Sequence, residues 1–599
     1  MSQTTTAAER PDTGAADPRT KRNILLVFAG LMVTMLLASL DQTIFSTALP
    51  TIVGQLHGVD EMLWVTTAYI LASTIMLPVY GKVGDLIGRK GIFIAAITIF
   101  IGGSIVGALA TGMPELIIGR AIQGIGGGGL MLLSQAIIAD VVPARERGRY
   151  MGIMGGVFAL SSVAGPLLGG YFTDGPGWQW CLWMNVPLGI LAILSAVFFL
   201  KLPKGRSTKP RLDYAGMGLL ALASAGLVLL TTWGGTTYAW NSPVIVTLIV
   251  GSVLAAAAFV LVERNASEPI MPLHLFKQRN FNLTTLSGLL IGISMFGALG
   301  YMPTYLQMVT GANATQAGLL MIPMMAALLV TSIGSGQLVS RTGRYKLLPI
   351  IGVLIVGVSL LLLSTMTATM PVWLICVYLA IMGLGLGMAM QILILIVQNT
   401  FPNSEVGTAT AANNYFRQIG ASIGTAVVGS LFVSRLTTLL GERLPATGTA
   451  NAGSANSFTP ELVKTLPSAL RNIIVGSYND ALAPVFMYMV PLMVVAAILL
   501  IFVVEKPLAT TIDHDALPES LEIDGATRVN LDHETDVLVN ASAEANDAHA
   551  GFDSGSKPRT DSIPVGSRNR SAAATAHSTR PAGRTSDEDP DALPLNAGV

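Results

Sequence analysis

Fourteen apolar runs of about twenty residues recur along this 599-residue chain, and they constrain its fold more than any other feature. A helix of twenty residues spans about 30 Å, the thickness of the hydrocarbon core of a bilayer. Charged residues make up only 12% of the sequence, whereas soluble domains carry roughly 25%. The pattern therefore predicts an all-α integral membrane protein with fourteen transmembrane helices. Those helices are expected at residues 24–49, 62–80, 91–111, 116–139, 149–172, 181–200, 214–233, 243–262, 281–305, 316–339, 347–367, 372–398, 405–433 and 483–504.

Lysine and arginine are unevenly distributed over the segments that join these runs. Six of the segments contain neither residue, and they alternate with strongly basic segments. Because basic loops stay on the cytoplasmic side, the alternation predicts a multi-pass protein of the plasma (inner) membrane with both termini in the cytoplasm. All seven tryptophans fall at the predicted outer ends, where tryptophan favours the headgroup level. The loop 434–482 breaks the pattern with four basic residues on the outer side, a deviation that long loops tolerate.

A ten-residue block occurs twice, as GKVGDLIGRK at 81–90 after the second run and as GQLVSRTGRY at 336–345 after the tenth. The repeat predicts two six-helix bundles with two additional central helices between them, and such paired halves enclose a midplane cavity in many secondary transporters. In the first copy, Asp85 is expected to pair with Arg89 or with a nearby helix N-terminus, as a charged latch. Ser340 replaces this carboxylate in the second copy, so the two copies have diverged.

The predicted domains follow from this repeat and from a change of composition after residue 504. They are a cytoplasmic N-terminal segment (1–22), an N-terminal six-helix bundle (23–201), a linker with helices seven and eight (202–280), a C-terminal six-helix bundle with a long outer loop (281–504 and, within it, 434–482) and a cytoplasmic tail (505–599). Residues 510–599 hold 7 Lys/Arg and 16 Asp/Glu, with Phe552 as their one aromatic residue. Such a segment buries too little apolar surface to fold alone, so we expect it to be disordered. Its histidines lack ligand spacing, and we expect no metal site and no cofactor.

Asp41 lies inside the first predicted helix and Arg120 inside the fourth. A carboxylate at the bilayer centre costs roughly 2.5–3.5 kcal/mol, so it is expected to have a function or a partner. From Ile24 to Asp41 the helix rises by about 26 Å, which places Asp41 in the outer half. Asp41 either pairs with Arg120 to hold helices together, or exchanges a proton in competition with a cationic substrate. Arg120 could instead extend its side chain to the membrane surface.

Several motifs together resemble the major facilitator superfamily. GKVGDLIGRK resembles its motif A, RAIQGIG (120–126) its motif B, and GIMGGVFALSSVAGPLLGG (152–170) its antiporter motif C. Two positions depart from the usual pattern, since Leu86 stands where motif A has arginine and Ser161 replaces a glycine of motif C.

Three further segments are similar to signatures of the fourteen-helix drug/proton antiporters, the EmrB/QacA type. They are LDQTIFSTALP (40–50), WQWCLWMNVP (178–187) and FRQIGASIG (416–424). The resemblance covers roughly residues 20–505, and the polar tail lies outside it.

The resemblance implies roles for particular residues. Asp41 and Arg120 would couple proton movement to substrate movement. The cytoplasmic gating motif would consist of Gly81, Asp85, Gly88, Arg89 and Lys90. The antiporter motif would consist of Gly152, Gly165, Pro166, Gly169 and Gly170. Candidate cavity residues are Gln123, Thr43, Phe45, Tyr301, Tyr305 and Arg417.

These observations predict a proton-coupled multidrug efflux antiporter that exports amphipathic or cationic compounds by alternating access. Its expected partners are small molecules, protons and the lipid bilayer, with no nucleic acid, and it is expected to function as a monomer. Two alternatives are a dedicated exporter of one native metabolite, lipid or siderophore, and a non-transporting membrane sensor or scaffold. An enzyme is not expected, because no set of nucleophile and base occurs. The glycine-rich run GIGGGG (124–129) lies in an apolar helix and favours close helix packing, not nucleotide binding.

Overall fold

The structure, a computed structural model, describes residues 18–58, 61–200, 202, 212–235, 237–443 and 460–510. Over those residues every named element is a helix, and 14 helical segments are long and apolar enough to cross a membrane. The predicted all-α fold with fourteen spans is therefore confirmed. The predicted disordered tail lies outside the described residues beyond residue 510.

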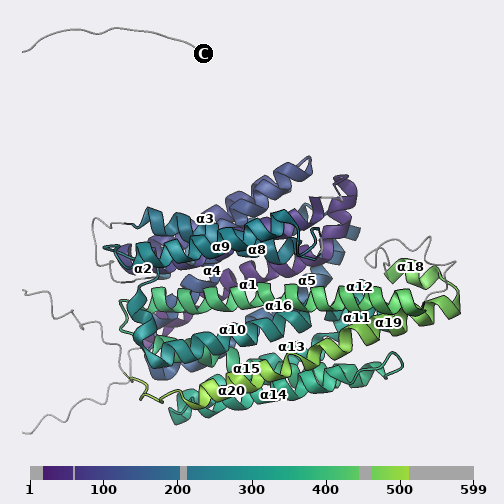
Figure 1. Ribbon diagram of the computed structural model, residues 1–599. Coiled ribbons are helices and arrows are strands. Elements are labelled where there is room, and N and C mark those ends of the chain that lie inside the picture. Colours follow the sequence, from purple (N-terminus) through teal and green to yellow (C-terminus); the bar gives the residue numbers. More distant parts are fainter. Residues whose placement is uncertain are drawn as a thin grey trace, which may run out of the picture. The chain divides into compact units, whose positions relative to one another are not determined.

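The helices form two groups, which we call the first half and the second half, and a pair of additional helices lies alongside them (Figure 1). The first half contains α1 (Pro18–Gln55), α2 (Met62–Ile87), α3 (Arg89–Ala108), α4 (Met113–Val141), α5 (Ala144–Asp174), α6 (Trp180–Trp183) and α7 (Asn185–Phe199). The additional pair is α8 (Tyr214–Trp233) and α9 (Pro243–Glu263), followed by the short 3₁₀ helix η2 (Leu273–Lys277). The second half contains α10 (Arg279–Leu299), α11 (Met302–Thr310), α12 (Ala314–Leu320), α13 (Ile322–Thr342), α14 (Leu347–Ser364), α15 (Val372–Gln398), α16 (Val406–Arg443), α18 (Pro460–Thr465), α19 (Ser468–Met487) and α20 (Val490–Ile501).

Helices form because a backbone surrounded by hydrocarbon must satisfy its hydrogen bonds internally. Three of the four interrupted spans resume just before a proline, namely Pro303 in α11, Pro323 in α13 and Pro491 in α20. Proline suits the first turn of a helix, where its missing N–H has no intrahelical partner to lose. Each of these spans is thus two helices in series.

The sequence predicted an outer loop over residues 434–482, and these bounds are wrong. α16 continues helically to Arg443, and α19 begins at Ser468. An ion pair of 2.8 Å between Arg443 and Asp480 joins the two helices where the prediction placed a loop. The apolar run marks only the part of a helix that meets lipid, so it underestimates helices that project beyond the bilayer.

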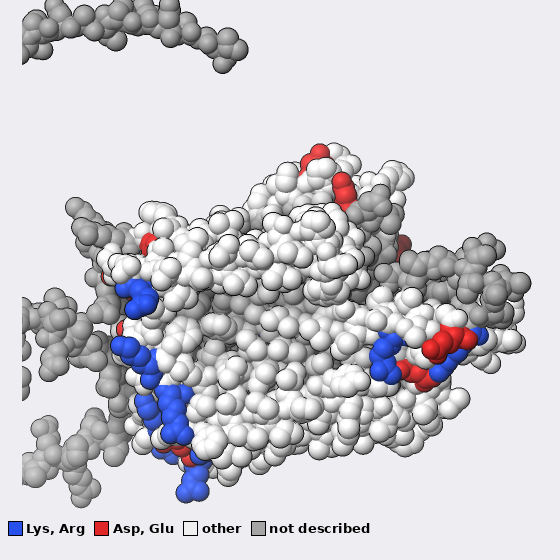
Figure 2. Space-filling view, viewed as in Figure 1, with Lys and Arg blue, Asp and Glu red and all other residues white. Residues whose placement is uncertain are grey.

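The two ends of the bundle differ in charge. At one end, the basic end, lie the α2–α3 turn at Gly88, the α4–α5 turn at Pro143 and the α13–α14 loop at Arg344. At the other, the tryptophan end, Trp64 and Trp233 are in edge contact, with ring centroids 5.6 Å apart. Figure 2 shows lysines and arginines at one end of the helices, a smaller group of mixed charge at the other, and an uncharged band between them.

The halves meet along two seams, where α5 packs on α13 and α2 packs on α16. The additional helices α8 and α9 pack against each other, and α8 also contacts α2 and α16. A hydrogen bond of 2.8 Å between the hydroxyls of Ser224 and Tyr415 fixes α8 to the second half. The additional pair therefore covers the α2–α16 seam.

Candidate functional site

Asp41 and Arg120 form a buried ion pair inside the first half. Arg120 Nη1 donates to Asp41 Oδ2 at 2.6 Å, and the side chains are 3% and 0% exposed for Arg120 and Asp41 respectively. The other carboxylate oxygen accepts from Gln123 Nε2 at 3.0 Å and from Asn185 Nδ2 at 2.8 Å. Both amides also donate to the Ser104 hydroxyl, at 2.7 and 3.2 Å. The carboxylate is thus held by donors from α4 and α7.

Two aromatic rings close the site. The guanidinium carbon of Arg120 lies 4.2 Å from the ring centroid of Phe45 and 4.3 Å from that of Tyr69. Arg120 does not extend to the membrane surface, so that interpretation is wrong. Because the side chain of Asp41 has no solvent exposure, a proton reaches it only after the surrounding helices move.

The motif A residues connect the two halves at the basic end. Asp85 accepts from the backbone amides of Gly407 and Thr408, at 3.2 and 2.7 Å, and from the Thr408 hydroxyl at 2.8 Å. Those residues begin α16, so the carboxylate sits at a helix N-terminus, where negative charge is stabilised. Asp85 also accepts from Arg89 Nη2 at 2.7 Å. Both contacts expected for the latch are therefore present.

Arg89 extends this network. It contacts Asp140 on α4 and donates to the carbonyl of Asn403 at 3.1 Å, in the segment before α16. Gly88 has a φ of 98°, a left-handed value that favours glycine and allows the sharp α2–α3 turn. Lys90 lies outside the network, with its ammonium donating to the carbonyl of Val197 at 3.0 Å.

The second copy of the repeat makes a related contact with the first half. The Ser340 hydroxyl accepts from the backbone amide of Arg149 at 3.1 Å, near the start of α5. Arg145 donates to the carbonyl of Arg341 at 3.3 Å. A neutral hydroxyl here takes the place that Asp85 has in the first copy, so the α5–α13 seam is joined without a buried ion pair.

Small residues bring the backbones together at the same end. A Cβ at Gly81 would lie 2.8 Å from the carbonyl oxygen of Gly407, and a Cβ at Gly152 would lie 2.4 Å from that of Ser332. The Ser332 hydroxyl donates to the carbonyl of Gly152 at 3.0 Å. These close approaches seal the basic end in this conformation.

Two further glycines of motif C, Gly165 and Gly169, allow α5 to pack closely on α1. A Cβ at Gly165 would lie 2.1 Å from the Thr43 hydroxyl, and one at Gly169 would lie 3.0 Å from the carbonyl oxygen of Ile44. Both neighbours belong to α1. A Cβ at Gly170 would meet nothing within 4 Å, and Pro166 lies beside Gly318 of α12. Along its length α5 therefore changes from packing on the second half to packing on its own half.

The candidate cavity residues do not form one group in this conformation. Gln123 and Phe45 belong to the buried ion-pair site, while Thr43 donates to the carbonyl of Ser161 at 2.9 Å. Tyr305 is fully buried and donates to Asn479 Oδ1 at 2.7 Å, in the core of the second half. Tyr301 donates to the carbonyl of Thr425 at 3.2 Å. Arg417 is partly exposed and has no partner among the described residues.

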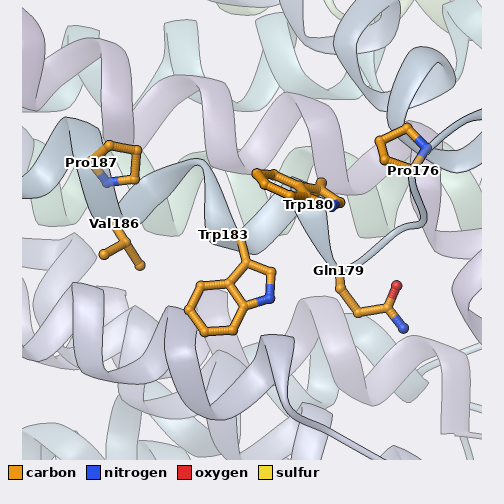
Figure 3. Close-up of a pocket in the computed structure, with 6 residues that line it drawn as sticks. All are labelled: Pro176, Gln179, Trp180, Trp183, Val186 and Pro187. Atoms are coloured by element: carbon orange, nitrogen blue, oxygen red, sulfur yellow. The ribbon is translucent and has the colours of Figure 1, made fainter.

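A pocket of about 460 Å³ lies at the tryptophan end, along residues 176–187, which comprise the end of the α5–α6 loop, α6 and the start of α7 (Figure 3). Its lining residues are Pro176, Gln179, Trp180, Trp183, Val186 and Pro187. The same segment carries Asn185, whose amide holds Asp41. The pocket and the ion-pair site therefore share one short stretch of backbone, although neither Asp41 nor Arg120 lines the pocket.

Three residues of the site were not singled out by the sequence: Asn185, Ser104 and Tyr69. Asn185 gave one detectable signal, because an amide inside the apolar segment WQWCLWMNVP requires a hydrogen-bond partner. Ser104 and Tyr69 are common in membrane helices and gave none.

Fourteen spans in two halves, with a buried ion pair and a latch between the halves, define a polytopic membrane transporter rather than an enzyme. The sequence profile of the Major Facilitator Superfamily matches residues 31–425. The chain belongs to this superfamily.

Named relatives agree with this assignment. An uncharacterized MFS-type transporter of Mycobacterium tuberculosis is 41% identical over 83% of this chain and 71% of its own length. The multidrug transporter protein MdtP of Bacillus subtilis is 35% identical over 82% of this chain and 94% of its own. Multidrug resistance protein 3 of the same organism is 32% identical, with coverages of 81% and 96%. Among solved structures, the MFS proton:xylose symporter XylE matches with a TM-score of 0.54 at 16% identity, covering 82% of this chain and 98% of that one, which shows the shared fold.

Proposed function

We propose that this chain is a proton-coupled multidrug efflux antiporter of the EmrB/QacA type, which exports amphipathic compounds, cationic ones among them, by alternating access. The observation that carries the proposal is the buried Asp41–Arg120 pair. It places a carboxylate without solvent access inside a membrane span, where it accepts hydrogen bonds from Arg120, Gln123 and Asn185. Relatives named as multidrug transporters support the export of drugs.

The site suggests how a proton and a cargo molecule exclude each other. Protonation of Asp41 removes the charge that Arg120 and the amides of Gln123 and Asn185 bind, so the α1–α4–α7 contacts loosen. Deprotonation restores them and tightens the first half. In our proposal one packing of these helices accepts cargo and the other accepts the proton. The latch at Asp85 and the glycine contacts of α5 then open and close the basic end, which we propose faces the cytoplasm together with both termini.

The driving force is sufficient for such an exchange. A proton that moves inward yields roughly 2.3 kcal/mol per 100 mV of membrane potential. Each pH unit adds about 1.4 kcal/mol. With 100 mV and one pH unit together, one proton per cycle could therefore sustain an outward gradient of roughly several hundredfold for a neutral compound.

A second candidate is the export of a single native metabolite. One relative is named as the MFS-type transporter of an acurin A biosynthesis cluster in Aspergillus aculeatus, with 30% identity over 72% of this chain. The fold and the ion pair are equally compatible with both functions. The two functions differ only in how many different compounds the protein exports.

Transport in vesicles of purified protein tests the proposal. An imposed pH gradient is expected to drive several structurally unrelated dyes against their concentration gradients, and nigericin, which collapses the pH gradient, is expected to stop the movement. Empty vesicles are the control. Movement of only one compound of the panel would favour the dedicated exporter, and movement that persists with nigericin would contradict proton coupling.

A further inference from the structure

Arg417 lies near the middle of the membrane without a counter-charge. It is 11 residues from the start of α16 at Val406, about 16 Å along a helix that begins at the basic end. Its guanidinium has no ion pair, hydrogen bond or ring contact within the part of the chain that the structure describes, and the residue is partly exposed. An unpaired arginine at this depth is unfavourable, so its retention indicates a ligand.

The helical repeat directs Arg417 toward the space between the halves. Thr410 precedes it by seven residues, which is nearly two full turns, so the two side chains share one face of α16. Thr410 contacts Gln398 of α15 at 3.5 Å, and Gln398 donates to the carbonyl of Gln135 on α4 at 3.1 Å. Asn414, three residues before Arg417, donates directly to Gln135 Oε1 on α4 at 2.9 Å. The side of α16 that carries Arg417 thus meets the opposite half toward the basic end and continues outward from that contact.

Gln391 lies at the same level on the neighbouring helix. It precedes Gln398 on α15 by seven residues, so it too lies two turns outward from the closed layer and on the same helical face as Gln398. Its Oε1 atom is inaccessible to solvent and has no hydrogen-bond partner among the described residues. A Cβ at Gly155 of α5 would lie 3.2 Å from Gln391 Nε2, so this amide faces the opposite half at the level of Arg417.

The charged side chains inside the helix bundle indicate which class of ligand Arg417 could bind. Asp41 and Arg120 neutralise each other, whereas Arg417 is uncompensated. A guanidinium matches a carboxylate or a phosphate in shape and binds it through two parallel hydrogen bonds.

We infer that Arg417 is a binding subsite for an acidic group of the cargo. The inference rests on the proposed export function and refines its substrate class: amphipathic compounds that carry a carboxylate, sulfonate or phosphate, zwitterions included. The subsite is separate from the ion pair. Gln135, which meets Asn414 one turn below Arg417, lies 15 residues from Arg120 on α4, a rise of about 22 Å.

Two dyes with the same xanthene framework and opposite charge test this subsite. Fluorescein is an anion at pH 8 and rhodamine 123 is a cation, and equilibrium binding of each to purified protein is measured by fluorescence anisotropy without a proton gradient. Arg417→Gln is expected to weaken fluorescein binding about tenfold or more and to leave rhodamine 123 binding unchanged or stronger. Arg417→Lys should retain part of the fluorescein affinity.

Arg344→Gln, in the α13–α14 loop, is the matched control because it removes the same charge elsewhere and should change neither affinity. Thermal melting serves as a second readout, since fluorescein should stabilise the wild type but not Arg417→Gln. Equal fluorescein affinity in wild type and Arg417→Gln, or no fluorescein binding by the wild type, would overturn the inference. So would displacement of fluorescein by phosphatidylglycerol, which would identify the occupant as a lipid. Dye transport by wild-type vesicles under a pH gradient tests proton coupling, and fluorescein binding without a gradient tests the subsite, so a failure of the proposed function and a failure of this subsite give different results.

Discussion

Asp41→Asn is expected to abolish transport driven by a pH gradient and to lower the melting temperature, while the protein still inserts its helices. The amide cannot exchange a proton, and it leaves Arg120 buried without its counter-ion. Breaking a buried pair by removal of one partner costs about 3–5 kcal/mol. Transport in vesicles and thermal unfolding in detergent measure the two effects separately.

A double variant separates coupling from stability. Asp41→Asn combined with Arg120→Gln removes both charges, so it should recover most of the stability that either single variant loses. It should nevertheless remain unable to use a pH gradient, because no carboxylate is left in the site. Recovery of gradient-driven transport in the double variant would show that the pair is only structural.

Gly336→Ala is expected to prevent closure of the basic end. A Cβ at Gly336 would lie 2.1 Å from the backbone carbonyl oxygen of Gly148, so α5 and α13 must separate. Overpacking of this kind costs about 1–3 kcal/mol, which would lower the closed population roughly five- to hundredfold. Export should fall accordingly, because a cycle of alternating access requires the closed form.

Spin labels can follow this opening directly. Ile87 and Leu347 are exposed at the basic end of the first and second halves, and the chain has only two cysteines to replace, Cys181 and Cys376. Labels at the two exposed positions should shift to longer separations in Gly336→Ala. Gly334→Ala is the matched control, because a Cβ at Gly334 on the same helix meets nothing within 4 Å. An unchanged distance distribution in Gly336→Ala would contradict the role of this contact.

The residues that carry charge in an apolar setting could be predicted from sequence. Asp41 and Arg120 interrupt hydrophobic runs, and only a partner or a function makes that tolerable. The structure supplies the partner. The expectation that Asp85 binds Arg89 or a helix N-terminus also followed from charge, but the sequence could not say that the helix is α16, more than three hundred residues away and in the other half.

The positions of neutral polar and aromatic residues were harder to predict from sequence than those of the charged residues. Tyr305 was a candidate cavity residue because tyrosine adapts to varied ligands, yet it packs in the core against Asn479. Composition does not reveal which face of a central helix a tyrosine occupies, since apolar residues surround it on every side. Asn185 was missed for a related reason: its approach to Asp41 depends on the break between α6 and α7, which hydropathy does not show.

The central claim is that Asp41 gives up a proton when cargo binds. Purified protein in a weakly buffered solution, loaded with protons at low pH, is mixed with a transported dye while a pH indicator records release. We expect about one proton per bound dye molecule from the wild type and none from Asp41→Asn. Equal proton release from the two proteins would show that another group carries the proton and would contradict the account.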